Sequence, residues 1–422
     1  MSAIRQLNGT QFHFYIFLQK WNWVPFLHIF AKMESNAKII ARAVLDEAKL
    51  LISQFRALCI VGPRQSGKTT LSKLLFPSKP YLSFENPAIQ AEASADPAGF
   101  LAQFSDGAIL DEVQRVPDIF RCLQGVLDKS NARGQYILTG SNNFLLQEQI
   151  SQSLAGRVGY LQLLPLSLSE LQDAGLAEEL DQHILKGGYP EIWNQKLIAP
   201  KWMSAYVQTY VQRDVRLLRN ITNLADFNRF LFLCADRVGQ LVNREDMARS
   251  IGVDTKTIQA WFSVLESSYV VQLLQPWFNN LNKRIIKSPK LYFYDTGLLC
   301  FLLGLQNKDS LRSHPHYGSI FENWVISEIT KNRLNQGVSG GLYFFRDSAG
   351  NEVDLLLEKN GKTIPVEIKS ARRFDSGMLS GIRYWKKLTR DDEGLLIYEG
   401  TGRDIPESGV ELLGWHDVSG VV

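Results

Sequence analysis

The sequence predicts an α/β protein with a parallel sheet in its N-terminal part and further domains behind it. Between about residues 51 and 171, short apolar runs alternate with helical patterns, which is typical of a parallel sheet with helices on both faces. The 422 residues are enough for about two to three domains. Apolar residues make up 45% and charged residues 21%, so a disordered or collagen-like chain is excluded.

The charges are nearly balanced, with 46 Lys and Arg against 43 Asp and Glu. This balance excludes a histone-like polycation but is compatible with a local basic face. The four cysteines, at positions 59, 122, 234 and 300, are far apart and form no CxxC pair. We therefore expect reduced thiols in a cytoplasmic protein, not a zinc site or a disulfide framework.

Residues 12–30 are apolar and rich in aromatic side chains, but Pro25 and several polar residues interrupt them. The segment fits neither a membrane-spanning helix nor a secretory signal well. We therefore favour an N-terminal extension, residues 1–32, that adds nothing to the fold, over a membrane segment.

The strongest motif matches GxxxxGK[ST] and is followed by a second threonine: Gly62, Pro63, Arg64, Gln65, Ser66, Gly67, Lys68, Thr69 and Thr70. An apolar strand pattern at 57–61 precedes it and a helical pattern follows, which is the context that this phosphate-binding loop requires. The glycines let backbone N–H groups face a phosphate, and the helix N-terminus adds a favourable dipole. Lys68 would reach the β- and γ-phosphates, and Thr69 would bind Mg²⁺.

An acidic pair, Asp111 and Glu112, follows a second apolar strand pattern at 107–110. An aspartate at the end of such a strand can hold Mg²⁺, and the adjacent glutamate can orient and deprotonate a water molecule. A further strand pattern at 81–84 lies in the chain between the phosphate-binding loop and this pair. It predicts the additional-strand form of the P-loop architecture.

Polar residues also follow the strand pattern at 135–138. Thr139, Ser141 or Asn142 could contact the γ-phosphate or the attacking water, although a turn that caps the next helix would have the same pattern. Arg157 could neutralise transition-state charge, either in its own chain or from a neighbouring subunit, or it could form a surface ion pair.

Together with ILDEVQRVPDIF, ILTGSNNFLL, SLAGRVGYLQLLPLSLSEL and GGYPEIW, these motifs resemble a family of prokaryotic AAA-like ATPases with a C-terminal domain of unknown function. The resemblance covers about residue 39 to the C-terminus. It implies an ATPase that uses ATP and Mg²⁺, with Asp111 at the metal, Glu112 as catalytic glutamate, a sensor such as Asn142, and Arg157 as a candidate finger. We expect an AAA-like core at 33–175 and a helical lid at 176–225.

The sequence pattern of residues 226–300 predicts a winged helix. Asn243 and Asp254 are suited to cap two short helices that are joined by a turn at Gly252. Strand patterns at 269–274 and 291–294 flank a basic wing with Lys283, Arg284, Lys287 and Lys290. In a DNA complex, Lys256 and Gln259 would face the major groove and the wing would contact phosphates. A module used only for packing or protein contact is the alternative, because its second helix has a single Lys near its start.

Residues 311–422 predict a further domain with a helix at 318–328 and strands at 342–346, 351–357 and 363–368. An Asn-Gly turn at 360–361 predicts a hairpin that brings Asp354 close to Glu367 and Lys369. Carboxylates can bind Mg²⁺ and a lysine can polarise water, while Glu322 or Glu328 could complete the site. This pattern resembles the PD-(D/E)xK nuclease superfamily, which implies a restriction-endonuclease-like fold and a metal site of Glu322, Asp354, Glu367 and Lys369. A half-exposed strand with outward charges is the alternative.

The sequence thus predicts a Mg²⁺-dependent ATPase that is coupled to work on DNA. A homo-oligomer would follow if Arg157 acts on a neighbouring subunit. Two alternatives stay open: an ATP-gated, metal-dependent DNA nuclease, and a non-catalytic signalling or interaction module that uses a nuclease fold.

Overall fold

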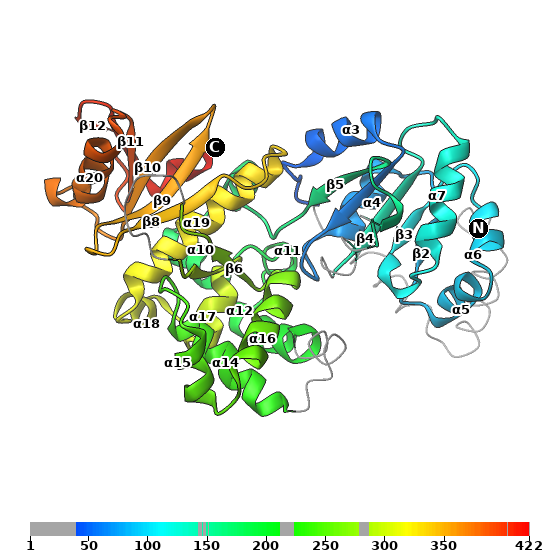
Figure 1. Ribbon diagram of the computed structural model, residues 1–422, viewed down its shortest axis with the longest axis horizontal. Coiled ribbons are helices and arrows are strands. Elements are labelled where there is room, and N and C mark those ends of the chain that lie inside the picture. Colours follow the sequence, from blue (N-terminus) through cyan, green and yellow to red (C-terminus); the bar gives the residue numbers. More distant parts are fainter. Residues whose placement is uncertain are drawn as a thin grey trace, which may run out of the picture.

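The computed structural model describes residues 39–141, 146, 149–150, 152–211, 223–277, 287–402 and 404–421. The predicted extension at 1–32 therefore lies outside the described residues. Figure 1 shows two lobes: an N-terminal domain (residues 39–163) and a second lobe formed by the rest of the chain. Among the described residues, no helix is both long and apolar enough to cross a membrane.

The N-terminal domain contains a five-stranded parallel sheet in the order β2-β3-β4-β1-β5. Its strands are β1 (Ala57–Val61), β2 (Tyr81–Ser83), β3 (Ile109–Asp111), β4 (Tyr136–Gly140) and β5 (Val158–Gln162). The predicted strand at 81–84 is the edge strand β2. The strand that separates β1 from β3 in space is β4 and not β2, a relation that chain order did not reveal.

Helices cover both faces of this sheet, as the alternating pattern predicted. Alternate residues of β1 enter two different cores, with Leu58 and Ile60 in one and Cys59 in the other. The first core is closed by α3 (Leu45–Gln54) and α4 (Lys68–Leu75). The second is closed by α5 (Pro87–Ala95), α6 (Pro97–Ala102) and α7 (Ile119–Lys129). The carboxyl ends of all five strands therefore meet at one open edge.

A helical region (the middle region, residues 168–312) follows. It begins with α9 (Leu168–Asp173), α10 (Leu180–Lys186), α11 (Pro190–Asn194), α12 (Ala199–Tyr206) and a π-helix (Val207–Val211). Next come α14 (Leu224–Asp236), α15 (Arg244–Ile251), α16 (Thr255–Ser267), β6 (Val271–Leu274), β7 (Lys290–Phe293), α17 (Thr296–Leu302) and α18 (Lys308–Arg312). The side chains of Asn243 and Asp254 cap α15 and α16 as predicted, and β6 pairs with β7 in antiparallel fashion.

The C-terminal domain (residues 317–421) begins with the long helix α19 (Tyr317–Asn335). Its mixed sheet has the order β12-β13-β11-β10-β9-β8. The strands are β8 (Leu342–Arg346), β9 (Glu352–Lys359), β10 (Lys362–Lys369), β11 (Gly394–Tyr398), β12 (Asp404–Glu407) and β13 (Val410–Gly414), with α20 (Ser380–Thr389) between β10 and β11. The predicted hairpin is present: β9 and β10 pair, and Asn360 and Gly361 both have positive φ, at 51° and 76°.

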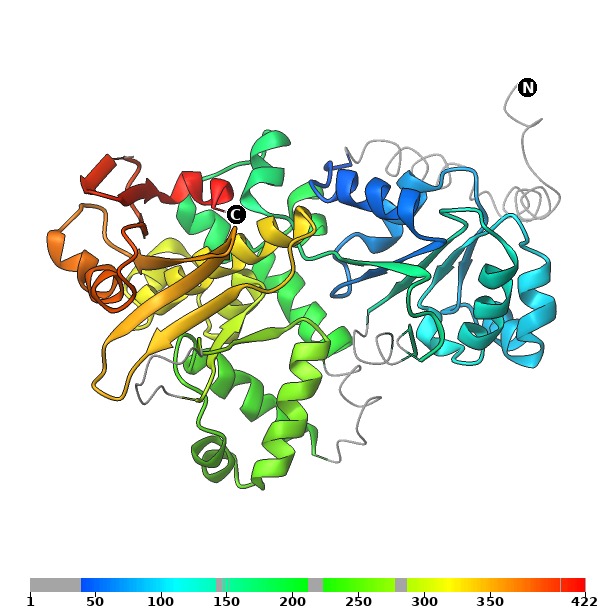
Figure 2. The ribbon, with the colours of Figure 1, turned by 45° about the horizontal axis from the view of Figure 1, so that its top comes forward.

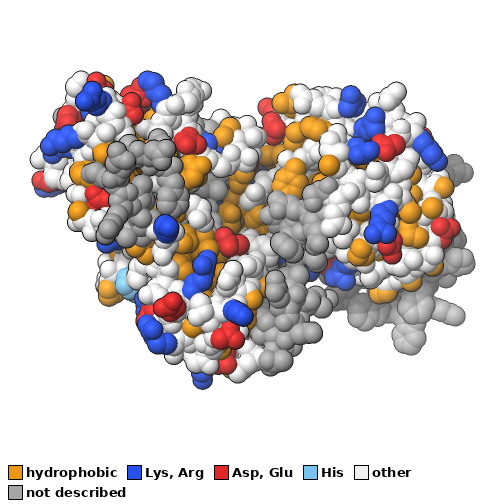
Figure 3. Space-filling view, in the orientation of Figure 1, with side chains coloured by type: hydrophobic (Ala, Val, Ile, Leu, Met, Phe, Trp, Pro, Cys, Tyr) orange, Lys and Arg blue, Asp and Glu red, His pale blue; other side chains and the backbone are white. Residues whose placement is uncertain are grey.

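The middle region and the C-terminal domain share one hydrophobic core, which includes residues from Leu166 to Val421 and also Ile40 of the N-terminal domain. Helix α19 is buried on most sides within it, which explains why its sequence lacks a clean polar face. Both ribbon views show α19 reaching from the C-terminal sheet to the N-terminal domain (Figure 2). There the chain at Gly337 packs on Glu47 of α3. The space-filling view shows hydrophobic side chains in the hollow between the two lobes (Figure 3).

Candidate functional site

The phosphate-binding loop leaves β1 at Gly62 and enters α4 at Lys68. Gly62 must be a glycine because a Cβ there would lie 2.0 Å from the carbonyl oxygen of Leu163. Gly67 has a left-handed φ of 96°, which glycine adopts without strain. Lys68 is buried, and its Nζ donates to the carbonyl oxygens of Gly62 (3.0 Å) and Pro63 (2.8 Å). The loop thus curls around its own lysine.

Asp111 lies at the carboxyl end of β3, beside this loop. Its Oδ1 is 3.5 Å from the hydroxyl of Thr69 and also accepts a short hydrogen bond from Thr139. Its Oδ2 accepts a hydrogen bond of 2.6 Å from Tyr81. The predicted magnesium ligands, Thr69 and Asp111, are therefore together, and two hydroxyls from neighbouring strands orient the aspartate.

Glu112 adopts a left-handed backbone conformation, with φ of 53°, which is uncommon for a residue other than glycine and often marks a functional position. Its Oε2 accepts a hydrogen bond from Ser141 (3.0 Å) and a short one from Gln114. Burial acts to raise the pKa of Glu112, but the charges of Lys68 and Arg64 and the two hydrogen bonds outweigh it and lower the pKa. The carboxylate is therefore ionised at neutral pH.

The residues of the loop fit a nucleotide and its metal. The hydroxyl of Ser66 is buried and has no hydrogen-bond partner among the described residues, an arrangement that a bound phosphate would satisfy. Thr69 and Asp111 would hold Mg²⁺, which prefers oxygen ligands. Thr139 and Ser141, two of the sensor candidates, contact Asp111 and Glu112 respectively. Asn142 lies outside the described residues.

Arg157 does not lie at this site in its own chain. It directly precedes β5, which is parallel to β1, so it stands at the amino edge of the sheet, and the phosphate-binding loop is at the opposite edge. Its guanidinium pairs with Asp128 at 2.6 and 2.9 Å. The prediction of a finger acting within the same chain is therefore wrong, because chain direction places the arginine one strand length away.

The structure adds a residue that the motifs did not reveal. The guanidinium of Arg42 donates to the carbonyl oxygen of Ser66 in the phosphate-binding loop (2.7 Å) and to that of Leu164 (2.7 Å). It also pairs with Glu170 of α9 at 2.9 Å, with both side chains buried. Arg42 thus connects the loop to the segment that leaves the N-terminal domain.

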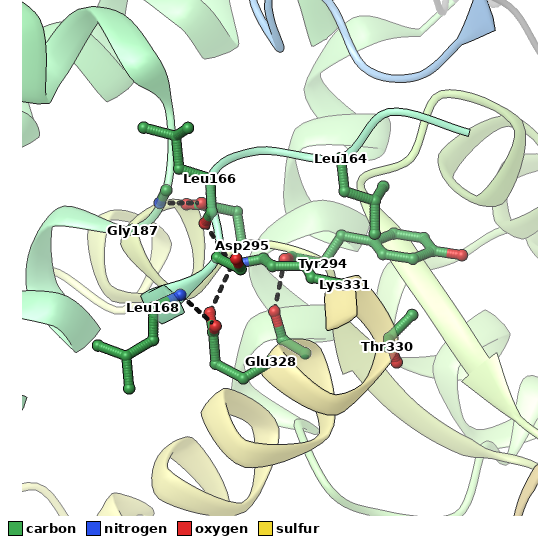
Figure 4. Close-up of polar contacts among 12 residues, drawn as sticks. Leu164, Leu166, Leu168, Gly187, Tyr294, Asp295, Glu328, Thr330 and Lys331 are labelled. Carbon is green, nitrogen blue, oxygen red and sulfur yellow. Dashed lines mark hydrogen bonds and ion pairs between the residues drawn. The ribbon is translucent and has the colours of Figure 1, made fainter. Parts of the chain in front are cut away.

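That segment is held by a buried polar junction with the rest of the second lobe (Figure 4). The backbone N–H of Leu168 donates to Glu328 of α19 (2.6 Å), and Lys331 donates to Glu328 (2.7 Å) and to the carbonyl oxygen of Leu166 (3.1 Å). On the other side, the N–H of Leu166 donates to the carbonyl oxygen of Gly188 (2.7 Å). Glu328 therefore belongs to this junction and not to the acidic cluster near Asp354.

The same junction explains why the GGYP motif has two glycines. The N–H of Gly188 donates to Asp295 (2.7 Å), which caps α17. A Cβ at Gly187 would lie 2.2 Å from the Asp295 carboxylate, and one at Gly188 would lie 2.3 Å from the carbonyl oxygen of Leu166. Burial raises the pKa of Asp295, although the nearby Lys331 opposes this effect.

The predicted acidic cluster of the C-terminal domain does form. Lys369 pairs with Asp354 at 2.7 Å and more closely with Glu367, while the N–H of Ile368 donates to Asp354 (2.9 Å). Glu322 approaches from α19 and accepts a short hydrogen bond from Tyr292. Burial and the charge of Asp354 raise the pKa of Glu367 to about 8, and burial also raises the pKa of Glu322.

Lys290, which was predicted as a basic residue of an exposed wing, is buried in this cluster and only 3% exposed. It pairs with Glu322 (3.3 Å) and with Glu352. The prediction failed because Lys290 is the first residue of β7 and its side chain faces acids of the C-terminal domain. Lys287 is exposed, and Lys283 and Arg284 lie outside the described residues.

These cluster residues do not fit a divalent metal. Within the described ranges, no group of three or more His, Cys, Asp or Glu side chains is arranged to hold a metal ion. Lysine ammonium groups instead contact the carboxylates of Glu322, Asp354 and Glu367.

On the second helix of the predicted helix-turn-helix, Lys256 and Gln259 are exposed as expected. The buried residues of α16, Ile258, Trp261, Phe262 and Leu265, pack into the shared core on its other face. The helix therefore has a free face, on which Lys256 is accompanied by the acidic cap Asp254.

Family models match three consecutive parts of the chain: an AAA domain at residues 54–172, and domains of unknown function at 177–309 (DUF8612) and 317–416 (DUF4143). Uncharacterized proteins of Mycobacterium bovis and Mycobacterium tuberculosis are each 34% identical over 314 residues, which is 74% of this chain and 69% of theirs. An uncharacterized protein of Methanocaldococcus jannaschii is 22% identical, covering 79% of this chain and 78% of its own.

Among solved structures, the Walker-type ATPase of Pyrococcus abyssi aligns with a TM-score of 0.43 and 13% identity, covering 63% of this chain and 96% of that chain. The AAA match coincides with the domain that carries the phosphate-binding loop, Asp111 and Glu112. The chain therefore belongs to the family of the two mycobacterial proteins, and its residues 54–172 are an AAA-type P-loop ATPase domain.

Proposed function

We propose that this protein binds ATP with Mg²⁺ and hydrolyses it at the carboxyl edge of the N-terminal sheet. The observation that carries the proposal is the position of the buried Glu112 carboxylate, which follows Asp111 at the carboxyl end of β3 and accepts a hydrogen bond from Ser141. The nearby charges of Lys68 and Arg64 act to lower its pKa. A carboxylate in this position can accept a proton from the attacking water. Lys68 would exchange its carbonyl acceptors for the β- and γ-phosphates. Bound Mg²⁺ would neutralise developing charge on the phosphate oxygens.

The contacts of Ser141 and Gln114 give Glu112 a further property. Both side chains donate to the same carboxylate oxygen, Oε2. They restrain the carboxylate in one orientation. Thr139, which bonds Asp111, contacts the backbone N–H of Glu112 as well. The end of β4 therefore couples the positions of the two acidic residues.

Substitutions of Lys68 and Glu112 test the ATPase proposal. Lys68→Ala should abolish turnover because it removes the phosphate contact, and Glu112→Gln should lower kcat by about 10²-fold or more because an amide cannot take the proton. Lys49→Ala and Glu92→Gln are matched controls on the exposed surface of the same domain. Unchanged phosphate release in both site variants would refute the proposal.

We further propose that the nucleotide state is transmitted to the second lobe through Arg42. This residue bonds the phosphate-binding loop, Leu164 and Glu170 at once. Glu170 also forms a capping box with Ser167, whose neighbour Leu168 bonds Glu328 of α19. If ATP binding moves the phosphate-binding loop, Arg42 and Glu170 would move with it, and the contact between Leu168 and Glu328 would pass this movement to α19.

We propose that this movement drives work on DNA, as the sequence predicted. The order of α14, α15, α16, β6 and β7, with a bridge between Leu241 and Lys290, supports a winged helix. Basic and acidic side chains are interspersed on the face shown in Figure 3. We therefore expect modest, salt-sensitive binding to duplex DNA. Lys256→Ala should weaken it, and ATP turnover with and without DNA would show whether the domains are coupled.

Arg157 stays a candidate finger only across a subunit boundary. If the chain forms a homo-oligomer in which Arg157 reaches a neighbour's site, mixing Arg157→Ala with Glu112→Gln subunits should restore part of the lost activity. Mixtures that stay as inactive as the separate variants would exclude this role.

A further inference from the structure

The acidic cluster of the C-terminal domain has a partner that comes from outside that domain. Lys290 is the first residue of β7 in the middle region. Its strand is held on both sides, by Leu274 of β6 and by the bridge to Leu241. The N–H of Val242 also donates to the carbonyl oxygen of Pro289 at 2.8 Å. The backbone of Lys290 is therefore fixed, and its side chain has little freedom to leave the cluster.

The side chains of Lys290 and Tyr292 act together. Residues two apart in a strand point to the same face, and both contact the carboxylate of Glu322. Asn323, the next residue of α19, bonds both the N–H (2.6 Å) and the carbonyl oxygen (3.0 Å) of Phe293. The start of α19 is therefore attached to β7 through backbone and side chain at once.

Each acidic group of the cluster already has a basic partner. Lys290 forms ion pairs with Glu322 and Glu352. Arg346 forms a second ion pair with Glu352 at 3.1 Å. Lys369 forms ion pairs with Asp354 and Glu367. Four carboxylates thus face three basic side chains. With all four acids ionised, the set has a net charge of −1, which a divalent ion would reverse; the same ion added after removal of one lysine would balance the charge. Because the pKa of Glu367 is about 8, an ion would also have to displace a proton from this carboxyl at neutral pH.

Helix α20 covers one side of the cluster. A Cβ at Gly381 would lie 1.8 Å from Oε1 of Glu367 and 2.5 Å from the carbonyl oxygen of Glu352. The glycine allows the helix backbone to lie directly on these groups, and Glu367 is consequently buried. A DNA phosphate could not approach Glu367 from this side without displacement of the helix.

We propose that the ammonium group of Lys290 is the resident cation of this cluster, which joins the middle region to the C-terminal domain and is not a divalent-metal site. The cluster therefore fixes α19 against β7 and does not cut DNA. This inference is independent of ATP hydrolysis, because none of its groups touches the nucleotide site.

Mn²⁺ binding to the nucleotide-free full-length protein, measured by titration calorimetry, tests the proposal. Wild type and Asp354→Asn should give the same isotherm, because any weak binding comes from the N-terminal domain. Lys290→Met should gain one Mn²⁺ site and a higher Tm with Mn²⁺ than without it. Both gains should vanish in Lys290→Met/Asp354→Asn. Lys362→Met, which removes an exposed lysine of β10 paired with Glu393, is the control and should gain nothing.

Two results would overturn the proposal. One is stoichiometric Mn²⁺ binding by the wild type that Asp354→Asn removes, or Mn²⁺-dependent DNA cleavage with the same sensitivity. The other is a folded Lys290→Met variant that gains no Mn²⁺ site. The comparison of wild type with Asp354→Asn decides the question even if Lys290→Met does not fold.

Discussion

Replacement of Glu328 by glutamine should destabilise the second lobe strongly, although the side chain keeps its shape. Glu328 and Lys331 form a buried ion pair, with side chains 4% and 5% exposed. Glutamine can still accept the hydrogen bond from Leu168, but it leaves the Lys331 ammonium group without its neutralising charge. Removal of one partner of a buried pair costs about 3–5 kcal/mol. Lys331 keeps the carbonyl oxygen of Leu166 and the nearby charge of Asp295, so we expect about 3 kcal/mol.

A double-mutant cycle separates this charge effect from a simple loss of packing. In Glu328→Gln/Lys331→Met both charges are absent, so the double variant should recover to within about 1 kcal/mol of wild type. Urea unfolding followed by tryptophan fluorescence is a suitable assay, because Trp324 lies one helical turn before Glu328 in α19. Glu393→Gln, which breaks the exposed pair with Lys362, is the control and should leave the stability nearly unchanged. A cost below about 1 kcal/mol for Glu328→Gln, or strictly additive effects in the double variant, would refute the reasoning.

Two further predictions follow from single side chains. Burial lowers the pKa of His183 to about 4, and its Nε2 accepts a hydrogen bond from the N–H of Glu178. Because the folded-state pKa lies below the unfolded value, neutral His183 contributes fully to the free energy of unfolding above about pH 6.5. This contribution, about 3 kcal/mol, is lost as the pH falls toward 4. Urea unfolding between pH 7 and pH 4 should therefore show a smaller pH dependence in His183→Gln than in wild type, and equal slopes would contradict this prediction. Tyr81→Phe removes the hydrogen bond to Asp111 and should raise the Mg²⁺ concentration for half-maximal ATP turnover about tenfold, while an unchanged Mg²⁺ dependence would show that the hydroxyl does not orient the aspartate.

The nucleotide site was predictable because its signals are local. The loop from Gly62 to Thr69 is one continuous motif, and Asp111 follows a strand pattern that could be read from a few residues. Parallel strands then bring these short segments to one edge without further information. The position of Arg157 was also readable from chain direction, because it stands before its strand and not after it.

The junction and the acidic cluster could not be predicted in the same way. Arg42 and Glu170 are 128 residues apart, and Leu168 and Glu328 are 160 apart. Neither contact leaves a spacing that the sequence alone displays. Lys290 was assigned to a basic wing because it follows Lys283, Arg284 and Lys287 in the chain. Its role depends on which face of β7 meets α19, and this is decided by packing between two domains.

The shared core of the middle region and the C-terminal domain has a consequence for how such proteins can change by recombination. A break in the chain between residues 309 and 317 falls between two family matches, yet it would divide a core that extends from Leu166 to Val421. A foreign C-terminal domain would have to supply the apolar residues of α19 and an acidic group for Lys290 as well. The second lobe should therefore be inherited as one unit. An exchange of the N-terminal domain would leave most of its two cores intact, but it would have to keep Arg42 for Glu170 and the contacts of Ile40 and Tyr269, which cross between the lobes.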